Sequence, residues 1–215
     1  MTARGRPSPE TINPADLRLP YSREGMRIGL FGGSFDPPHD GHLQVSLVAL
    51  RALCLDQVWW LVSPQNPLKP DAPSNDLSRR IAAARTVARH PRIRVTGVEA
   101  ALGTTYTAET LGQLLPRLRG VDCVWMMGAD NLANFHRWRG WRGIASTIPI
   151  AVFNRPGLAR SALSSPAAKA LWRSRHDPAD AAAIAGSPPP AWVFLPSPHV
   201  AMSSTELRAS QRKSS

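Results

Sequence analysis

The segment GLFGGSFDPPHDGHL, residues 29–43, gathers residue types that suit an anionic ligand. An apolar run ends in a pair of glycines, and His39 and His42 follow it three residues apart. Glycine lets backbone N–H groups approach a ligand, and an imidazole donates a hydrogen bond when neutral and supplies charge when protonated. A helix beginning near Gly41 would add the positive end of its dipole. The segment therefore predicts a phosphate-binding turn.

The spacing separates this turn from two common phosphate loops. Gly32, Gly33 and Ser34 match neither the G-x-G-x-x-G pattern of dinucleotide-dependent oxidoreductases nor a Walker loop. Gly41, between the two histidines, allows the backbone to approach the ligand while both rings face the same phosphate group. We therefore expect backbone donors from the glycine pair and side-chain donors from the histidine pair.

The elements that would position this turn alternate between strands and helices. Apolar runs predict strands at residues 26–32, 57–63, 92–99, 121–128, 146–154 and 191–196. Helical periodicity predicts helices at residues 41–55, 77–90, 107–118 and 129–138. This alternation is typical of an α/β protein with a doubly wound parallel sheet in a single domain, in which ligands bind beyond the carboxyl ends of the strands.

The two ends and one internal stretch carry weaker patterns. Residues 1–24 are rich in Pro, Arg and Ser without a hydrophobic period, which predicts a disordered extension before a folded domain at 25–210. Residues 155–190 predict a loop with one short helix at 167–176. Residues 203–210 predict a final helix that begins with a Ser or Thr cap.

Charge and composition limit the classes of function that the sequence allows. The chain has 215 residues with 26 Lys+Arg against 15 Asp+Glu, and its formal charge of +11 favours an anionic partner. The basic residues are scattered, and Arg79, Arg80, Arg85 and Arg89 are expected on a helix surface. No window approaches the roughly 18 apolar residues of a membrane span, and the N-terminus lacks the apolar core of a signal peptide. We therefore expect a cytoplasmic protein.

Two motifs carry a resemblance to a known superfamily. GGSFDPPHDGH resembles the G-x-F-D-P-x-H-x-G-H signature of the nucleotidyltransferase superfamily, and MSSTELR, residues 202–208, resembles the S-x-T-x-x-R pattern of its adenylyltransferases. This superfamily shares a Rossmann-like core with class I aminoacyl-tRNA synthetases. The resemblance implies that residues 25–210 form a Rossmann-like nucleotidyltransferase domain.

The middle of the chain resembles one family within that superfamily. GADNLANFHRWRGW, residues 128–141, and TTYTAETL, residues 104–111, are similar to segments of bacterial nicotinate-nucleotide adenylyltransferases, as are SPQNPLK and NRPG. The resemblance implies adenylyl transfer from ATP to nicotinate mononucleotide, which gives deamido-NAD and pyrophosphate in NAD biosynthesis. We also expect Mg²⁺ as a cofactor, carried by ATP and not by protein ligands, because few carboxylates lie near these motifs.

The resemblance also implies roles for individual residues. His39, His42 and Arg208 would be the catalytic residues that act on the phosphates. The other implied contacts to ATP and its phosphates are Gly32, Gly33, Ser34, Phe35, Gly41, Lys69, Ser203, Ser204 and Thr205. Trp138 would stack on the pyridinium ring, where a cation–π interaction is favourable. The other implied contacts to nicotinate mononucleotide are Thr105, Tyr106, Thr107, Asp130 and Arg155.

The residues leave two alternatives open. Another adenylyl- or cytidylyltransferase would use the same phosphate chemistry with phosphopantetheine or nicotinamide mononucleotide as the acceptor. A basic nucleic-acid-binding module could also keep a Rossmann-like core, although it predicts clustered basic residues. We expect ATP and nicotinate mononucleotide as partners, with no nucleic acid and no membrane, and the sequence is compatible with a homo-oligomer.

Overall fold

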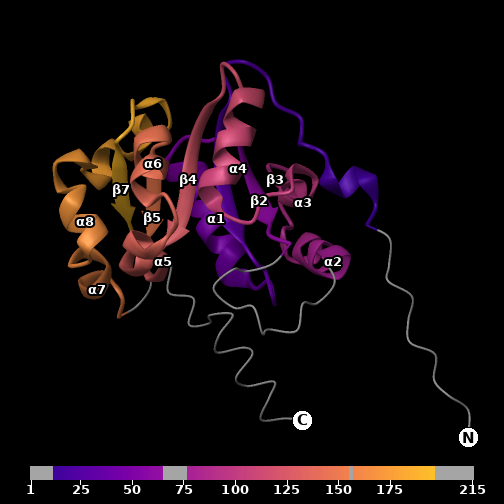
Figure 1. Ribbon diagram of the computed structural model, residues 1–215, viewed down its shortest axis with the longest axis horizontal. Helices are drawn as coiled ribbons and strands as arrows, with labels where there is room; N and C mark the ends of the chain where they lie inside the picture. The colour runs from indigo at the N-terminus through magenta and orange to yellow at the C-terminus, as the bar shows by residue number, and fades with distance from the viewer. Residues whose placement is uncertain (1–11, 65–76, 155–156, 197–215) are drawn as a thin grey trace, which may run out of the picture.

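The computed structural model describes residues 12–64, 77–154 and 157–196. Its centre is a seven-stranded sheet in which all paired strands are parallel, in the order β3-β2-β1-β4-β5-β7-β6 (Figure 1). The strands are β1 Arg27–Gly33, β2 Gln57–Val62, β3 Ile93–Thr96, β4 Asp122–Gly128, β5 Ile150–Phe153, β6 Arg175–His176 and β7 Trp192–Leu195. The prediction of a Rossmann-like, doubly wound α/β sheet in a single domain is confirmed.

Short helices connect these strands. The α-helices are α1 Asp40–Ala52, α2 Leu77–Val87, α3 Val98–Leu102, α4 Thr107–Leu114, α5 Ala129–Asn134, α6 Trp141–Thr147, α7 Ala159–Leu163 and α8 Pro166–Ala170. The 3-10 helices are η1 Pro14–Leu17, η2 Leu115–Arg117, η3 Phe135–Arg137, η4 Trp172–Ser174 and η5 Pro178–Gly186. Among the described residues, none of these helices combines the length and the apolar character that a membrane span requires.

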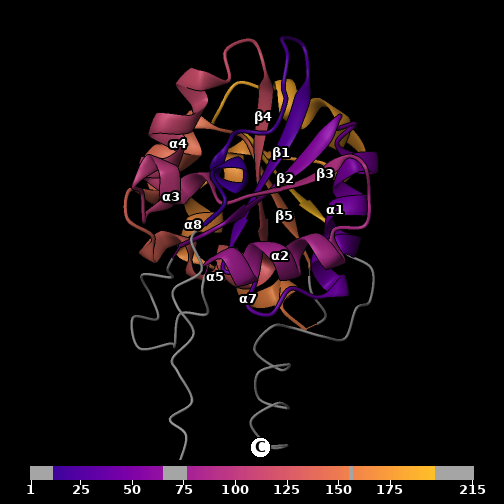
Figure 2. The ribbon, with the colours of Figure 1, turned by 90° about the vertical axis from the view of Figure 1, so that its right-hand side faces the viewer.

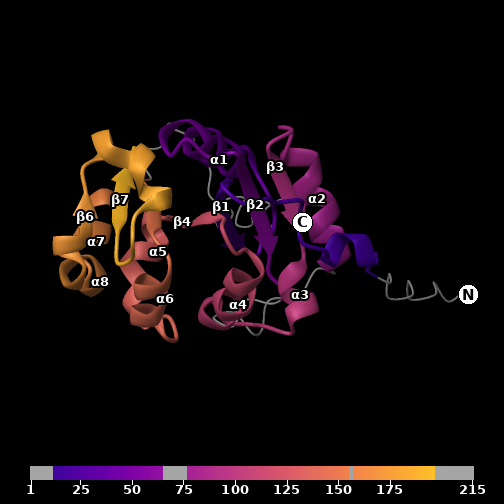
Figure 3. The same ribbon diagram turned by 90° about the horizontal axis from the view of Figure 1, so that it is seen from above.

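The alternation of side chains along the strands divides the core into two clusters. On β2, Trp59 and Leu61 belong to one cluster and Trp60 belongs to the other, because successive side chains of a strand point to opposite faces. Helices α3 to α8 contribute to the first cluster, whereas α1, α2 and η5 contribute to the second. The strands therefore lie between two helical layers, with α1 on one side and α4 on the other (Figures 2 and 3).

Several element boundaries differ from their predictions. Residues 157–190 form α7, α8, η4, strand β6 and η5 in place of a loop with one helix. These elements are two to nine residues long, which is too short for a hydrophobic period to develop. The strand expected at 92–99 ends at Thr96, and the strand expected at 146–154 begins at Ile150 because α6 precedes it. The helix expected at 203–210 lies outside the described residues.

Part of the expected N-terminal extension has a fixed structure. The helix η1 packs near α3 and the edge strand β3 (Figure 1). The hydroxyl of Thr96, at the end of β3, donates to the carbonyl oxygens of Asp16 and Arg18 at 3.3 and 2.8 Å. Residues 14–18 of the expected extension therefore contact the sheet edge in place of being disordered. Residues 1–11 lie outside the described residues.

Candidate active site

The strand order reverses direction between β1 and β4. The chain proceeds from β1 to β2 and β3 on one side, and from β4 to β5 on the other. Such a reversal opens a crevice at the carboxyl ends of the two central strands, where doubly wound sheets bind their ligands. A cavity of about 340 Å³ lies at this point. Its lining residues are Gly32, Gly33, Ser34, Ser63, Glu99, Thr105, Tyr106, Thr107, Trp125, Asn131, Arg137, Trp138 and Arg139.

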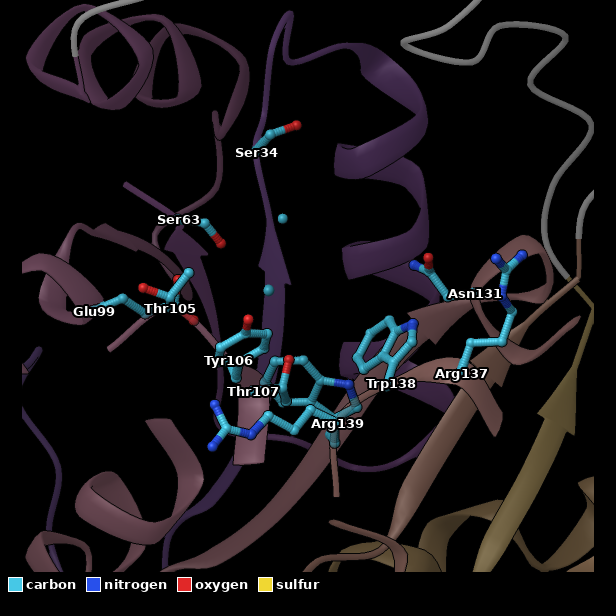
Figure 4. Close-up of a pocket in the computed structure, with 13 residues that line it drawn as sticks. Ser34, Ser63, Glu99, Thr105, Tyr106, Thr107, Asn131, Arg137, Trp138 and Arg139 are labelled. Atoms are coloured by element: carbon cyan, nitrogen blue, oxygen red, sulfur yellow. The ribbon is translucent and has the colours of Figure 1, made fainter. Parts of the chain in front are cut away.

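The cavity joins two chemically different ends. Ser34 and Ser63 follow β1 and β2 at one end, and Trp138 lies at the other (Figure 4). Tyr106 and Thr107, which belong to the start of α4, lie between them in the same view. The glycine turn is therefore part of the same cavity wall as the aromatic residue expected to stack on a pyridine ring.

The glycine end of the cavity depends on close packing against an indole. A Cβ on Gly32 would lie 2.5 Å from the ring of Trp125, which is closer than real Cβ contacts. A Cβ on Gly33 would lie 3.5 Å from the ring of Phe35, an ordinary contact distance. Trp125 is 2% exposed and fixed in the core. Gly32 is therefore required for packing between β1 and β4, in addition to the backbone access that the sequence predicts.

The two histidines meet at the beginning of α1. His39 is the N-cap of α1 and is 8% exposed, and Gly41 lies between it and His42 in the first turn. The backbone N–H of His39 donates to Nδ1 of His42 at 3.2 Å, and the ring centroids lie 3.9 Å apart. Because Nδ1 accepts, a neutral His42 ring carries its hydrogen on Nε2. The structure thus brings the predicted pair together at the positive end of a 13-residue helix.

Phe35 is placed in the core rather than on the cavity wall. Its ring is 2% exposed and stacks on Trp60 with centroids 4.9 Å apart. The same ring lies 4.9 Å from the ring of His42. The backbone φ of 46° is in the left-handed region, which is unusual for an aromatic residue. We therefore expect the side chain of Phe35 to support His42, and the phosphate contact expected from the sequence stays a prediction.

The aromatic end of the cavity combines rings with cationic side chains. Trp138 is half-buried and packs edge-on against Phe135, with ring centroids 5.4 Å apart. Tyr106 is the N-cap of α4, and the guanidinium of Arg139 lies 4.8 Å over its ring. Arg137 also lines this end. Aromatic faces and positive charge in one wall suit an aromatic ligand that bears an anionic group.

A buried carboxyl group, that of Glu99, connects neighbouring segments of this wall through hydrogen bonds. Glu99 is 6% exposed, and its carboxyl group hydrogen-bonds with the side chains of Ser63 and Thr110. The hydroxyls of Thr110 and Thr104 are 2.9 Å apart, and the backbone N–H of Thr104 donates to the carbonyl oxygen of Glu99 at 3.1 Å. The network links the end of β2 to the start of α4. It thereby fixes the segment that carries Thr105.

Replacement of Glu99 by glutamine should change how stability depends on pH. Burial raises the pKa of the Glu99 carboxyl, and the hydrogen bonds with Ser63 and Thr110 partly offset this effect. A raised pKa in the folded state means that ionisation costs folding free energy, so this cost grows as pH rises from the ordinary value of 4.5 through the folded-state pKa. Denaturant unfolding of both proteins should show that Glu99→Gln gains stability relative to wild type across this range. Parallel pH profiles would contradict a raised pKa.

The structure brings together most of the predicted residues that it describes. The predicted residues on the cavity wall are Gly32, Gly33, Ser34, Thr105, Tyr106, Thr107 and Trp138. The histidine pair lies on the turn that leaves this wall, and Asp130 lies in the first turn of α5. The predicted residues Lys69, Arg155, Ser203, Ser204, Thr205 and Arg208 lie outside the described residues, so their roles remain predictions.

The cavity also contains residues that the sequence analysis missed. They are Ser63, Glu99, Trp125, Asn131, Arg137 and Arg139. Ser63 could have been found, because a polar residue directly after a buried strand marks the edge of the sheet where ligands bind. Glu99 carries no such signal, because it was expected within a strand. Arg137 and Arg139 flank Trp138 in the sequence and could have been included with it.

Comparisons with known proteins identified relatives of this chain. A family model described as cytidylyltransferase-like matches residues 30–210. A protein of Cereibacter sphaeroides (strain ATCC 17025 / ATH 2.4.3), named probable nicotinate-nucleotide adenylyltransferase, is 55% identical over 187 residues, which cover 87% of this chain and 99% of the relative. A Rhizobium meliloti (strain 1021) protein of the same name is 53% identical and covers 86% of this chain and 99% of its own length.

Solved structures share the fold at low sequence identity. Plasmodium falciparum nicotinic acid mononucleotide adenylyltransferase complexed with NaAD has a TM-score of 0.63 and 15% identity, with 85% of this chain and 82% of that chain covered. The same enzyme complexed with APC has a TM-score of 0.62 and 14% identity, with 86% and 83% covered. These likenesses support the fold.

Proposed function

The chain belongs to the nicotinate-nucleotide adenylyltransferase family, and we propose that it transfers the adenylyl group of ATP to nicotinate mononucleotide, forming deamido-NAD and pyrophosphate. One observation carries this proposal. The cavity at the reversal point connects the turn Gly32–Ser34 to the wall that contains Tyr106 and Trp138. A site for this reaction needs such a connection, because the phosphate group of the mononucleotide must reach the α-phosphorus of ATP.

Catalysis at the phosphate end requires positioning and charge stabilisation. An oxygen of the mononucleotide phosphate attacks the α-phosphorus, and the bond from this phosphorus to the oxygen that bridges to the β-phosphorus breaks. Pyrophosphate carries away the electron pair of that bond, and no protein nucleophile is needed. We assign His39 and His42 to the oxygens of the α-phosphoryl group, where their N–H donors would stabilise developing charge. The end of β1 at Gly32 and Gly33 would supply backbone donors.

Residues from two other segments would complete the phosphate site. We assign Lys69 and the Ser203, Ser204, Thr205 and Arg208 group to the β- and γ-phosphates, because cationic and hydroxyl side chains stabilise a departing pyrophosphate. Both segments lie outside the described residues. The assignment rests on their match to the family motif.

The divalent metal of the reaction would arrive with ATP. Nucleotidyltransferases acting on ATP usually use such an ion, and we propose Mg²⁺. Among residues 12–64, 77–154 and 157–196, no three His, Cys, Asp or Glu side chains are grouped to hold a metal. Mg²⁺ bound by nucleotide phosphates commonly keeps water ligands and needs few protein carboxylates. Bound to ATP, the metal would neutralise phosphate charge.

The opposite end of the cavity would bind the nicotinate group. Stacking of the cationic pyridinium ring on Trp138 is favourable. Thr105, Tyr106 and Thr107 contribute N–H and hydroxyl donors to the wall, and Arg137 and Arg139 contribute positive charge. The guanidinium of Arg139 also pairs with the carboxylate of Glu109 at 3.2 Å. An amide in place of the carboxylate of the substrate would present its own NH₂ group to the donors of this wall and would lack the negative charge that a positively charged wall favours. We therefore propose a preference for the acid over the amide. We also assign Asp130 and Arg155 to nicotinate mononucleotide.

An acceptor comparison tests the proposed function. Pyrophosphate release is followed with ATP and Mg²⁺ plus nicotinate mononucleotide, nicotinamide mononucleotide or phosphopantetheine, each in a separate reaction. We expect kcat/KM to be highest with nicotinate mononucleotide, by about tenfold or more over its amide. Release with phosphopantetheine alone would show that the acceptor is wrong. No release with any acceptor would overturn adenylyl transfer.

A further inference from the structure

Arg80 is a buried cation in a helix that the sequence presents as a basic surface. The side chain of Arg80 is 6% exposed, whereas its neighbour Arg79 and the more distant Arg85 are exposed. Burial of a guanidinium group is costly unless hydrogen bonds replace its hydration. The hydrogen-bond partners of the guanidinium therefore indicate its role.

The guanidinium of Arg80 connects the ends of two central strands. Nη1 donates to the carbonyl oxygen of Ser34 at 2.8 Å and to that of Ser63 at 2.6 Å. Nη2 donates to the carbonyl oxygen of Pro64 at 2.8 Å. Ser34 follows β1 and Ser63 follows β2, and both line the cavity. One side chain from α2 therefore fixes the two strand ends that form the phosphate end of the site.

These hydrogen bonds affect which backbone groups, carbonyl oxygens or N–H donors, face an anion at this end of the cavity. A carbonyl oxygen facing a phosphate is repulsive, and the bonds to Arg80 hold three such oxygens on the guanidinium. In a trans peptide the C=O and the following N–H point in opposite directions. Fixing the carbonyl of Ser34 therefore also fixes the N–H of Phe35, whose backbone adopts the unusual φ of 46°. The guanidinium also keeps a permanent positive charge behind the turn.

We propose that Arg80 is a positioning residue for the triphosphate of ATP, acting through the main chain at Ser34, Ser63 and Pro64. The inference rests on the proposed adenylyl transfer and extends it to a residue outside the family motifs. It assigns Arg80 to ATP and not to the mononucleotide, because its contacts lie at the strand ends, at the opposite side of the cavity from Trp138.

The test compares Arg80→Lys with the matched variant Arg79→Lys. Lysine keeps the charge but lacks the planar fork that reaches three carbonyl oxygens. The readouts are KM and kcat for each substrate, the Kd of α,β-methylene-ATP and the Tm. We expect Arg80→Lys to raise the KM for ATP and the Kd of the analogue about tenfold, while the KM for nicotinate mononucleotide changes less than about twofold. Arg79→Lys should match wild type.

Three other outcomes would decide against the proposal. Equal losses for both substrates would indicate a general structural role, and no loss for ATP would show that the strand ends hold their geometry without Arg80. If Arg80→Lys does not fold, Arg80→Gln replaces it, and a failure of both to fold would make the role structural. If wild type releases no pyrophosphate, the proposed function fails, and the Kd of the analogue still tests Arg80 separately.

Discussion

Replacing His42 with alanine should lower kcat by about two to four orders of magnitude. His42 accepts a hydrogen bond at Nδ1 from the N–H of His39 at 3.2 Å, which places the hydrogen of its neutral ring on Nε2. Alanine removes the donor that we assign to the α-phosphoryl oxygens, and the charge that develops there loses its stabilisation. Pyrophosphate release under saturating substrates measures this loss directly.

The matched control for His42 is His90. His90 lies before the edge strand β3, and its Nδ1 accepts from the N–H of Arg92 at 3.2 Å, so it also has a local hydrogen bond. His90→Ala should keep the wild-type kcat. Because the ring of His42 packs against Phe35 and Trp60, the Tm of His42→Ala must be measured as well. A folded His42→Ala protein with wild-type turnover would exclude His42 from catalysis.

Replacing Trp138 with alanine should raise the KM for nicotinate mononucleotide about 30-fold, which corresponds to about 2 kcal/mol of lost stacking on a desolvated cationic ring. Trp138 is only half-buried, so the substitution removes a cavity wall without a large loss of core. The KM for ATP should stay within about twofold of wild type, because Trp138 lies at the other end of the cavity from Ser34 and Ser63 (Figure 4). Initial rates with each substrate varied in turn give both values.

Two further variants test whether the effect of Trp138→Ala on KM comes from lost stacking. Trp138→Phe retains an aromatic face and should lose less affinity than Trp138→Ala. Trp172→Ala removes an indole that is 59% exposed on η4 and does not line the cavity, so it should bind both substrates as wild type does. Equal KM values for nicotinate mononucleotide in Trp138→Ala and wild type would contradict the proposed stacking.

The parts of the site that the sequence predicted are those that a short motif determines. The glycine pair and the His39–His42 pair lie within a few residues of one another, so their spacing predicted a phosphate-binding segment before a helix start. The segment from Thr105 to Thr107 was implied by the resemblance to the family. The strand order then brings the turn and the Thr105–Thr107 segment into one cavity wall, as a doubly wound sheet requires.

The parts that could not be predicted depend on contacts between distant segments. Arg80 has the sequence context of an exposed helix residue, and only the meeting of α2 with the ends of β1 and β2 buries it. Glu99 acquires its network from Ser63 and Thr110, which belong to other elements. The ring of Phe35 packs in the core against Trp60 and His42, which the motif does not record, whereas its phosphate contact stays a prediction. Periodicity and motif spacing do not record such contacts.

The most direct test of the account is a crystal structure of this protein with deamido-NAD bound. The account predicts that the pyridine ring stacks on Trp138 while the bridging phosphates lie against the Gly32–Ser34 turn, within hydrogen-bonding distance of Nε2 of His42. Such a pose would place both halves of the product in the single cavity at the reversal between β1 and β4. A dinucleotide bound with its phosphates away from that turn, or with its pyridine ring away from Trp138, would contradict it.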